Sequence, residues 1–131
     1  MYHPVEVRSA GAKGRGVFAV RDIEVGDLIE RAPVIPMPSD AIDPINKTAL
    51  SYYVFMWGEA DWPGGEGYAV ALGYISLYNH SYTPNARYDR DYDKTELVIT
   101  ALKPIKAGEE IVVNYNGVPD CMDAVWFEVK S

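Results

Sequence analysis

The sequence contains a single cysteine, Cys121, among its 131 residues. One thiol cannot form an internal disulfide, and it cannot supply the cysteine-rich ligand set of a structural zinc site. Only two histidines are present, and neither stands in ligand spacing with the cysteine. We therefore expect no bound metal and a reducing compartment.

Long apolar runs are also missing. No stretch approaches the roughly 20 apolar residues that a membrane span requires, and the start, MYHPVEVRSAGAKGRG, lacks the apolar run of an export signal. We expect a soluble, intracellular protein, cytoplasmic or nuclear, with no membrane partner. The length fits one domain, which we place at residues 1–131 with residues 118–131 as a short C-terminal tail.

Positive charge is scarce, because 12 lysine and arginine residues stand against 19 acidic ones and give a net charge of −7. Nucleic-acid binding calls for a basic face that meets the phosphates, so no direct nucleic-acid binding is expected. An acidic surface suits a cationic ligand or peptide instead. The same charge also keeps ordinary proteins soluble, so charge alone assigns no function.

The chain does contain many short runs that are rich in β-branched and aromatic residues. Gly, Pro, Asn or Asp bounds each run, which predicts a mostly β domain. Residues 41–57, AIDPINKTALSYYVFMW, are the best helical candidate, although Pro44 and the aromatic cluster weaken this prediction. The predicted strands are VEVRSA, GVFAV, DLIERAPVI, YAVALGYISLY, TELVITAL and EEIVVNY.

One segment echoes another without a gap: VFAVRDIEVGDLI (17–29) and ITALKPIKAGEEI (99–111). Both have Ile six residues after their first residue and Gly nine residues after it. The echo predicts two similar strand-turn-strand units, in which Gly26 or Gly108 takes a positive φ and Ile23 or Ile105 packs beneath the turn. It predicts local structure and no chemistry.

A polar step follows the apolar residues 69–78, where Asn79, His80 and Ser81 stand in a row. Buried polar groups persist in folded proteins only where partners satisfy them, so other parts of the chain must supply those partners. Taken alone, Asn79 is better explained as a turn residue that bonds to the backbone near Pro84.

Four motifs stand in order: GAKGRGVFA (11–19), YNHSYTPNARY (78–88), AGEEIVVNY (107–115) and VWF (125–127). Together they resemble the SET domain, the β fold of protein-lysine methyltransferases that use S-adenosylmethionine. The similarity covers roughly residues 5–127, and the second and third motifs are its specific part. It implies a β-clip type fold of short sheets, with one or two short helices. A knot-like C-terminal crossing would bring residues 79–80 beside residue 115.

The resemblance assigns roles to three tyrosines. Tyr115, at the end of EEIVVNY, occupies the position of the catalytic tyrosine, and Tyr88 matches a second tyrosine of the lysine channel. Tyr53 is a looser candidate for the channel wall, and a core role fits it as well. A lysine has an unperturbed pKa near 10.4, so an apolar channel would favour the neutral amine that can attack a methyl group.

The resemblance also implies a set of cofactor contacts. Lys13 either meets the carboxylate of the cofactor or is a solvated charge, and Asn79 bonds the amino acid end. His80 contributes mainly backbone contacts to the adenine and is not proposed as a general base. Trp126 either covers the adenine or anchors the tail as an apolar residue. The implied cofactor-binding residues are Lys13, Gly14, Arg15, Gly16, Asn79, His80 and Trp126.

Two features depart from the family pattern. The cysteine-rich zinc clusters that flank many members are absent, and Asn116 stands where Gly usually follows the tyrosine. The sequence therefore predicts S-adenosylmethionine-dependent methyl transfer to the ε-amine of an accessible lysine in a protein or peptide, with a histone tail as one candidate. The alternatives are a non-catalytic SET-fold module that binds such a peptide and an unrelated β-barrel. A homodimer is left open.

Overall fold

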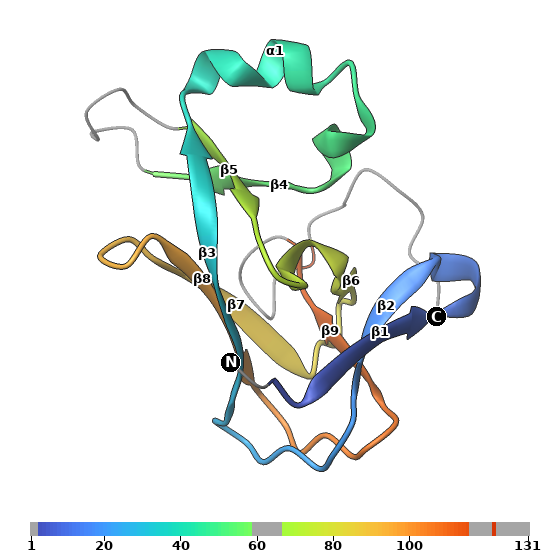
Figure 1. The fold of residues 1–131 in the computed structure, drawn as a ribbon. Helices are drawn as coiled ribbons and strands as arrows, with labels where there is room; N and C mark the ends of the chain where they lie inside the picture. Colours follow the sequence, from blue (N-terminus) through green and yellow to red (C-terminus); the bar gives the residue numbers. More distant parts are fainter. Residues whose placement is uncertain (1–2, 59–66, 116–121, 123–131) are drawn as a thin grey trace. The chain divides into compact units, whose positions relative to one another are not determined.

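The computed structural model describes residues 3–58, 67–115 and 122, which are drawn in colour in Figure 1. Strands make up most of the ordered elements, which confirms the mostly β prediction. The strands are β1 (Val5–Ser9), β2 (Arg15–Ala19), β3 (Leu28–Met37), β4 (Val54–Trp57), β5 (Gly67–Ala71), β6 (Asn79–His80), β7 (Ala86–Asp91), β8 (Glu96–Ala101) and β9 (Glu110–Val113). The helices are the α-helix α1 (Ile42–Ile45) and the 3₁₀ turns η1 (Gly11–Lys13), η2 (Ser39–Ala41), η3 (Ala49–Tyr52) and η4 (Ile75–Leu77).

Two compact units divide the chain. The first comprises Met1–Arg31, Leu77–Asp89 and Val98–Ser131, and the second comprises Ala32–Ser76 and Arg90–Leu97. Each unit has buried apolar side chains of its own: Val17, Ile29 and Ile111 belong to the first, and Val34, Trp57 and Leu97 to the second. The expectation of one domain over residues 1–131 stays a prediction.

A four-stranded sheet lies wholly in the first unit, with the strand order β1-β2-β9-β6. β1 and β2 form an antiparallel hairpin, and β2 pairs antiparallel with β9. β6 has only two residues, and it pairs in parallel with β9, so that Asn79 faces Val112 and His80 faces Val113. The first two residues of the polar step therefore form a short strand beside the strand that leads to Tyr115.

A second sheet has the order β4-β5-β3-β8-β7. Within the second unit, β5 pairs antiparallel with both β3 and β4. The Trp57 ring meets the Tyr92 ring edge-on at 4.9 Å between centroids, and the Arg90 Nε donates a hydrogen bond to the Met56 carbonyl at 2.7 Å. These contacts hold β4 to the segment that begins at Arg90.

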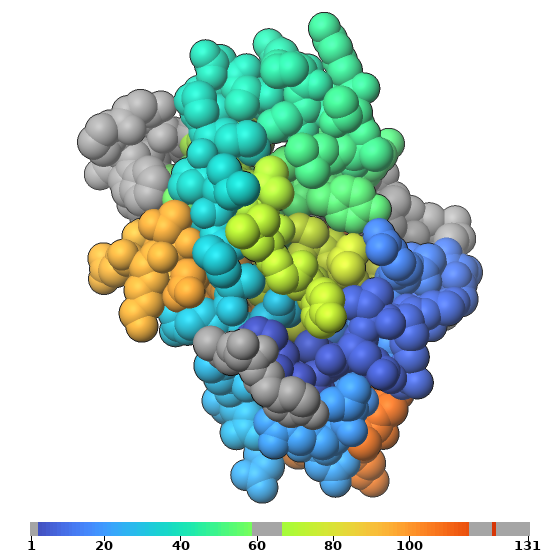
Figure 2. Space-filling model, in the orientation of Figure 1, coloured from blue at the N-terminus to red at the C-terminus, as the bar shows by residue number. Residues whose placement is uncertain are grey.

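The two echoing segments pair with each other. The Ile23 N–H donates to the Ile105 carbonyl at 2.7 Å, and the Ile105 N–H donates to the Ile23 carbonyl at 2.9 Å. Both isoleucines are buried, at 4% and 1% exposure. Figures 1 and 2 show the two turns, one blue and one orange, side by side at the bottom of the view. The sequence echo is thus a two-fold-like structural unit.

Matching glycines complete this unit. Gly26 and Gly108 have φ values of 84° and 91°, as predicted from the echo. The Gly26 N–H donates to the Ala101 carbonyl at 2.9 Å, and the Gly108 N–H donates to the Ala19 carbonyl at 2.8 Å. Each turn is therefore bonded to the strand of the other copy, and the two copies stabilise each other.

Two local predictions were wrong. Residues 41–57 form one α-helical turn, a 3₁₀ turn and strand β4 instead of a helix, because Pro44 limits helical hydrogen bonding and the β-branched and aromatic residues at the end favour a strand. The run 68–78 is not one strand, since β5 ends at Ala71, Gly73 has a φ of 65°, and η4 precedes β6. Strand β7 follows Pro84 and was not predicted.

Within the described ranges, no helix is long and apolar enough to cross a membrane.

Candidate active site

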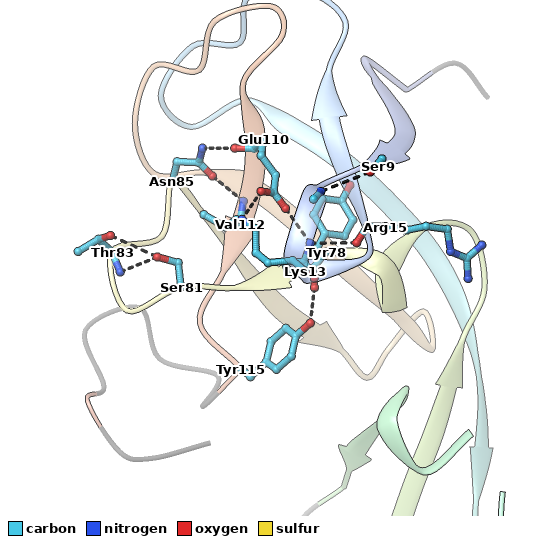
Figure 3. Close-up of polar contacts among 12 residues, drawn as sticks. Ser9, Lys13, Arg15, Tyr78, Ser81, Thr83, Asn85, Glu110, Val112 and Tyr115 are labelled. Carbon is cyan, nitrogen blue, oxygen red and sulfur yellow. Dashed lines mark hydrogen bonds and ion pairs between the residues drawn. The ribbon is translucent and has the colours of Figure 1, made fainter. Parts of the chain in front are cut away.

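The site is assembled by strand β9, which lies between β2 and β6 in the four-stranded sheet. Pairing with β2 brings Gly16 and the turn before it to one side of β9, and pairing with β6 brings Asn79 and His80 to the other. Three motifs that are far apart in the sequence therefore meet within the first unit. Figure 3 labels Lys13, Asn85, Glu110 and Tyr115 among the polar contacts of these motifs.

Glu110 is the centre of the first polar group. Its carboxylate forms an ion pair with Lys13 through Oε1, and it accepts a hydrogen bond from Asn79 Nδ2 through Oε2 at 2.7 Å. Asn79 Nδ2 also donates to the Arg15 carbonyl at 2.9 Å. Lys13 is held in this group with its side chain 21% exposed, so it is not a freely solvated charge.

The geometry of Asn79 limits what its side chain can still bind. Both donor positions of the amide nitrogen are taken, by Arg15 and by Glu110. The side-chain oxygen Oδ1 therefore offers an acceptor, and an acceptor recognises an ammonium group and not a carboxylate.

Gly16 closes this group from the β2 side. A Cβ on Gly16 would stand 2.6 Å from Glu110 Oε2 and 2.9 Å from Asn79 Nδ2, which is closer than real side chains approach. Only glycine leaves room for the hydrogen bond between those two residues. Gly14 directly follows the 3₁₀ turn η1, and its N–H donates to the Gly11 carbonyl at 3.1 Å.

His80 and Tyr115 form the second polar group. The Tyr115 N–H donates to His80 Nδ1 at 2.9 Å, and the two rings lie 5.3 Å apart between centroids. This confirms that residues 79–80 and 115 lie side by side. His80 is 4% exposed, and burial lowers the pKa of its imidazole. The neutral ring that accepts at Nδ1 carries its proton on Nε2.

The hydroxyl of Tyr115 is directed by a main-chain oxygen. It donates to the Tyr78 carbonyl at 2.6 Å, as the dashed line in Figure 3 shows. Tyr88, which is 6% exposed, donates its hydroxyl to the Tyr115 carbonyl at 3.0 Å. The side chain and the backbone of Tyr115 are therefore both fixed, by Tyr78, His80 and Tyr88.

Asn85 has a role that the sequence did not indicate. Its Nδ2 donates to the Glu110 carbonyl at 2.8 Å, and its Oδ1 accepts from the Val112 N–H at 2.9 Å. One side chain thus binds two backbone groups on one edge of β9, as Figure 3 shows. The spacing Pro84-Asn85 was visible in the motif, but the partner strand lies about 25 residues away and only the fold identifies it.

Two residues implied by the resemblance are not tested by these contacts. Tyr53 belongs to the second unit, where its carbonyl accepts a hydrogen bond from the Ser76 hydroxyl at 3.0 Å. Trp126 lies outside the described residues, as do Asn116 and most of the predicted tail. In residues 3–58, 67–115 and 122, no three His, Cys, Asp or Glu side chains gather as metal ligands would.

Comparison with known proteins identifies the family. Residues 14–116 match the SET domain model. A Schizosaccharomyces pombe protein described as a histone-lysine N-methyltransferase, H3 lysine-37 specific, is 32% identical over 129 residues, which cover 98% of this chain and 80% of that protein. The chain therefore belongs to the SET-domain family of protein-lysine N-methyltransferases.

Solved structures have the same fold. One of them is described as the structural basis for the product specificity of histone lysine methyltransferases. It aligns with a TM-score of 0.76 and 21% identity, and the alignment covers 95% of this chain and 56% of that chain. An autoinhibited ctPRC2 bound to S-adenosylmethionine has a TM-score of 0.69 at 21% identity and covers 91% of this chain and 16% of that one. These similarities support the SET fold of the chain.

Proposed function

We propose that this protein methylates the ε-amine of a lysine in a basic protein segment, with a histone H3 tail as the first substrate to test. The fixed position of Tyr115 carries this proposal. Its hydroxyl is bonded to the Tyr78 carbonyl and its N–H to His80, at the junction of β6 and β9. A displacement that needs nitrogen, carbon and leaving group in line depends on such positioning.

The residues present fit S-adenosylmethionine as the methyl donor. Asn79 offers an acceptor for the ammonium of the amino acid end, and Gly16 keeps the adjacent backbone free of a side chain. When bound, this cofactor supplies an activated methyl group on a positively charged sulfur. Lys13, Gly14, Arg15, Gly16, Asn79 and His80 are the described residues that would hold it, and Trp126 would cover the adenine.

The chain's own part in the reaction is to hold a neutral lysine. Tyr115 orients the amine through its hydroxyl, and the buried Tyr88 forms a second wall of the lysine channel. Tyr53 remains a candidate for the channel wall. Removing water from the amine lowers its pKa toward the range where the neutral, attacking form is available. His80 is not needed as a general base, because its Nδ1 accepts the hydrogen bond from the Tyr115 N–H.

The proposed substrate class follows from charge and from the relative. The chain has a net charge of −7, which favours a cationic segment such as a histone tail. The Schizosaccharomyces pombe relative is described as acting on histone H3. A histone substrate would place the protein in the nucleus.

The test uses purified protein, radiolabelled S-adenosylmethionine and two pools, core histones and a bacterial lysate. We expect label on the histone H3 band, with mass spectrometry locating the methyl group on a lysine. Label confined to lysate proteins would contradict the histone assignment but keep lysine methylation. Absence of label from both pools, with cofactor binding detected by calorimetry, would favour the non-catalytic binding module.

A further inference from the structure

Glu30 is a buried carboxylate that lies outside every motif described above. It is the third residue of β3 and is 1% exposed. Burying a charged group costs free energy unless hydrogen bonds or ion pairs compensate for the lost water. A carboxylate at such a position is therefore expected to have a specific structural or functional use.

Glu30 is bonded to the residue that directs Tyr115. The Tyr78 hydroxyl donates to Glu30 Oε1 at 2.8 Å, and Tyr78 is 1% exposed, one of the largest fully buried side chains. Burial and, secondly, the charge of Glu30 raise the pKa of the Tyr78 phenol. The phenol therefore stays protonated and remains a donor at physiological pH.

Tyr78 connects this bond to the site through its own backbone. Its carbonyl accepts the Tyr115 hydroxyl at 2.6 Å, and the next residue in the chain is Asn79. A packed phenol with its hydroxyl fixed has one side-chain orientation, and the backbone that carries it is fixed as well. The position of the carbonyl, and hence of the Tyr115 hydroxyl, depends on the contact between Tyr78 and Glu30.

We propose that Glu30 and Tyr78 form a buried positioning pair that holds the main-chain acceptor of the Tyr115 hydroxyl. This inference rests on the proposed function, in which Tyr115 orients the lysine amine. Neither residue touches the substrate in this account, so both act through Tyr115. Phenylalanine at position 78 would fill nearly the same volume but would leave the carboxylate without its phenol donor.

The test compares three variants with wild type: Tyr78→Phe, Glu30→Leu and Glu30→Gln. In Tyr78→Phe and Glu30→Leu we expect kcat to fall about 10-fold. The cofactor Kd and the peptide KM should stay within about 2-fold of the wild-type values, because the pair orients Tyr115 for the reaction and does not bind either ligand. Glu30→Gln keeps an acceptor for the phenol, so it should retain kcat within about 3-fold. Rescue by this conservative variant separates positioning from general packing.

Stability is controlled by Ile105→Val, a core substitution in the paired turns, where Ile105 pairs with Ile23. Assays run well below the unfolding midpoint of every variant. If Tyr78→Phe keeps the wild-type kcat while losing stability as Ile105→Val does, the pair is structural only and the inference is overturned.

A second readout does not require activity. With ¹³C-labelled tyrosine, the ring resonance of Tyr115 is assigned by its loss in Tyr115→Phe. We expect this resonance to shift or broaden in Tyr78→Phe and to stay in place in Ile105→Val. An unchanged Tyr115 resonance in Tyr78→Phe would contradict the positioning pair. If the wild-type protein transfers no methyl group but Tyr78→Phe still shifts the Tyr115 resonance, the proposed function is contradicted and the positioning pair is not.

Discussion

At the scale of single residues, the polar step Asn79-His80-Ser81 is satisfied almost entirely by the backbone and side chains of distant motifs. Asn79 donates to Arg15 and Glu110, and His80 accepts from Tyr115. Only the side chain of Ser81 is bonded locally: its hydroxyl accepts from the Thr83 N–H at 3.0 Å, while its own N–H donates to the Val113 carbonyl at 2.9 Å. The first two residues organise the site, while the third shapes the turn that follows.

Glu110 should control cofactor binding through Asn79. In Glu110→Gln, the ion pair with Lys13 is lost and the bond to Asn79 is weakened. We expect the Kd for S-adenosylmethionine to rise about 10-fold, the scale of one charge-assisted hydrogen bond. Calorimetry gives the Kd. Glu109→Gln is the matched control, because the neighbouring Glu109 is exposed and should leave the Kd unchanged. Equal affinities for the two variants would contradict this role.

His80 should make the stability of the protein depend on pH. Burial lowers the pKa of His80 below 6.5, so the unfolded chain takes up this proton first as the pH falls. The free energy of unfolding should therefore decrease from about pH 6.5 downward, until the pKa of the folded state is reached. The protonated ring would also place an N–H donor against the Tyr115 N–H, which is itself a donor.

Denaturant unfolding at about pH 7.5 and about pH 5.5 measures this effect. Wild type and His3→Asn should lose more stability at the lower pH than His80→Asn, in which the side-chain oxygen can accept the Tyr115 N–H at either pH. The same loss in all three proteins would show that other groups cause the pH dependence.

The sequence predicted part of the site and could not predict the rest. Tyr115, Asn79 and His80 were named through the resemblance of their motifs to the SET domain, and the structure joins His80 to Tyr115 by a hydrogen bond. Glu30 and Tyr78 are 48 residues apart, and Lys13 and Glu110 are 97 apart. Such pairs are brought together by the pairing of distant segments, and no local pattern in the sequence encodes which segments will be neighbours.

At the scale of elements, the paired turns are the clearest repeated structure of the fold. The sequence echo predicted both positive φ glycines, because a positive φ strongly favours glycine. It did not predict that the two copies would bond to each other through Ile23 and Ile105. The prediction of a helix over residues 41–57 was wrong because the segment has helical signals at its start and strand-forming residues at its end.

Substitutions at the two glycines should have matching effects. A Cβ at Gly26 or Gly108 would meet no atom within 4 Å, so the cost of alanine comes from the backbone conformation alone. We expect Gly26→Ala and Gly108→Ala each to reduce the free energy of unfolding by about 1–2 kcal/mol. Asparagine tolerates this conformation better and should cost less at both positions.

Denaturant unfolding of the four variants tests this prediction. If alanine costs no more free energy of unfolding than asparagine, the argument from backbone conformation is contradicted. If substitution destabilises the protein at only one of the two turns, the equivalence of the repeats is contradicted.

At the scale of the whole molecule, charge should govern the encounter with a basic substrate. The net charge is −7, and attraction between exposed charges weakens as salt screens them. For a lysine-rich peptide, KM should rise about 3-fold to 10-fold between about 50 and about 300 mM NaCl, while kcat stays nearly constant. A peptide with the same target lysine and neutral flanking residues is the control. A KM that does not depend on salt would contradict the charge argument.

Tyr115 is the residue on which the account of the whole molecule depends. The most direct measurement is the kcat of methyl transfer to a lysine peptide by wild type, Tyr115→Phe and Tyr52→Phe, together with the Kd of each protein for S-adenosylmethionine. Tyr52 is 62% exposed and serves as the matched control. We predict that Tyr115→Phe binds the cofactor normally and loses at least about 100-fold in kcat, while Tyr52→Phe keeps both. A Tyr115→Phe variant that turns over like wild type would contradict the central claim.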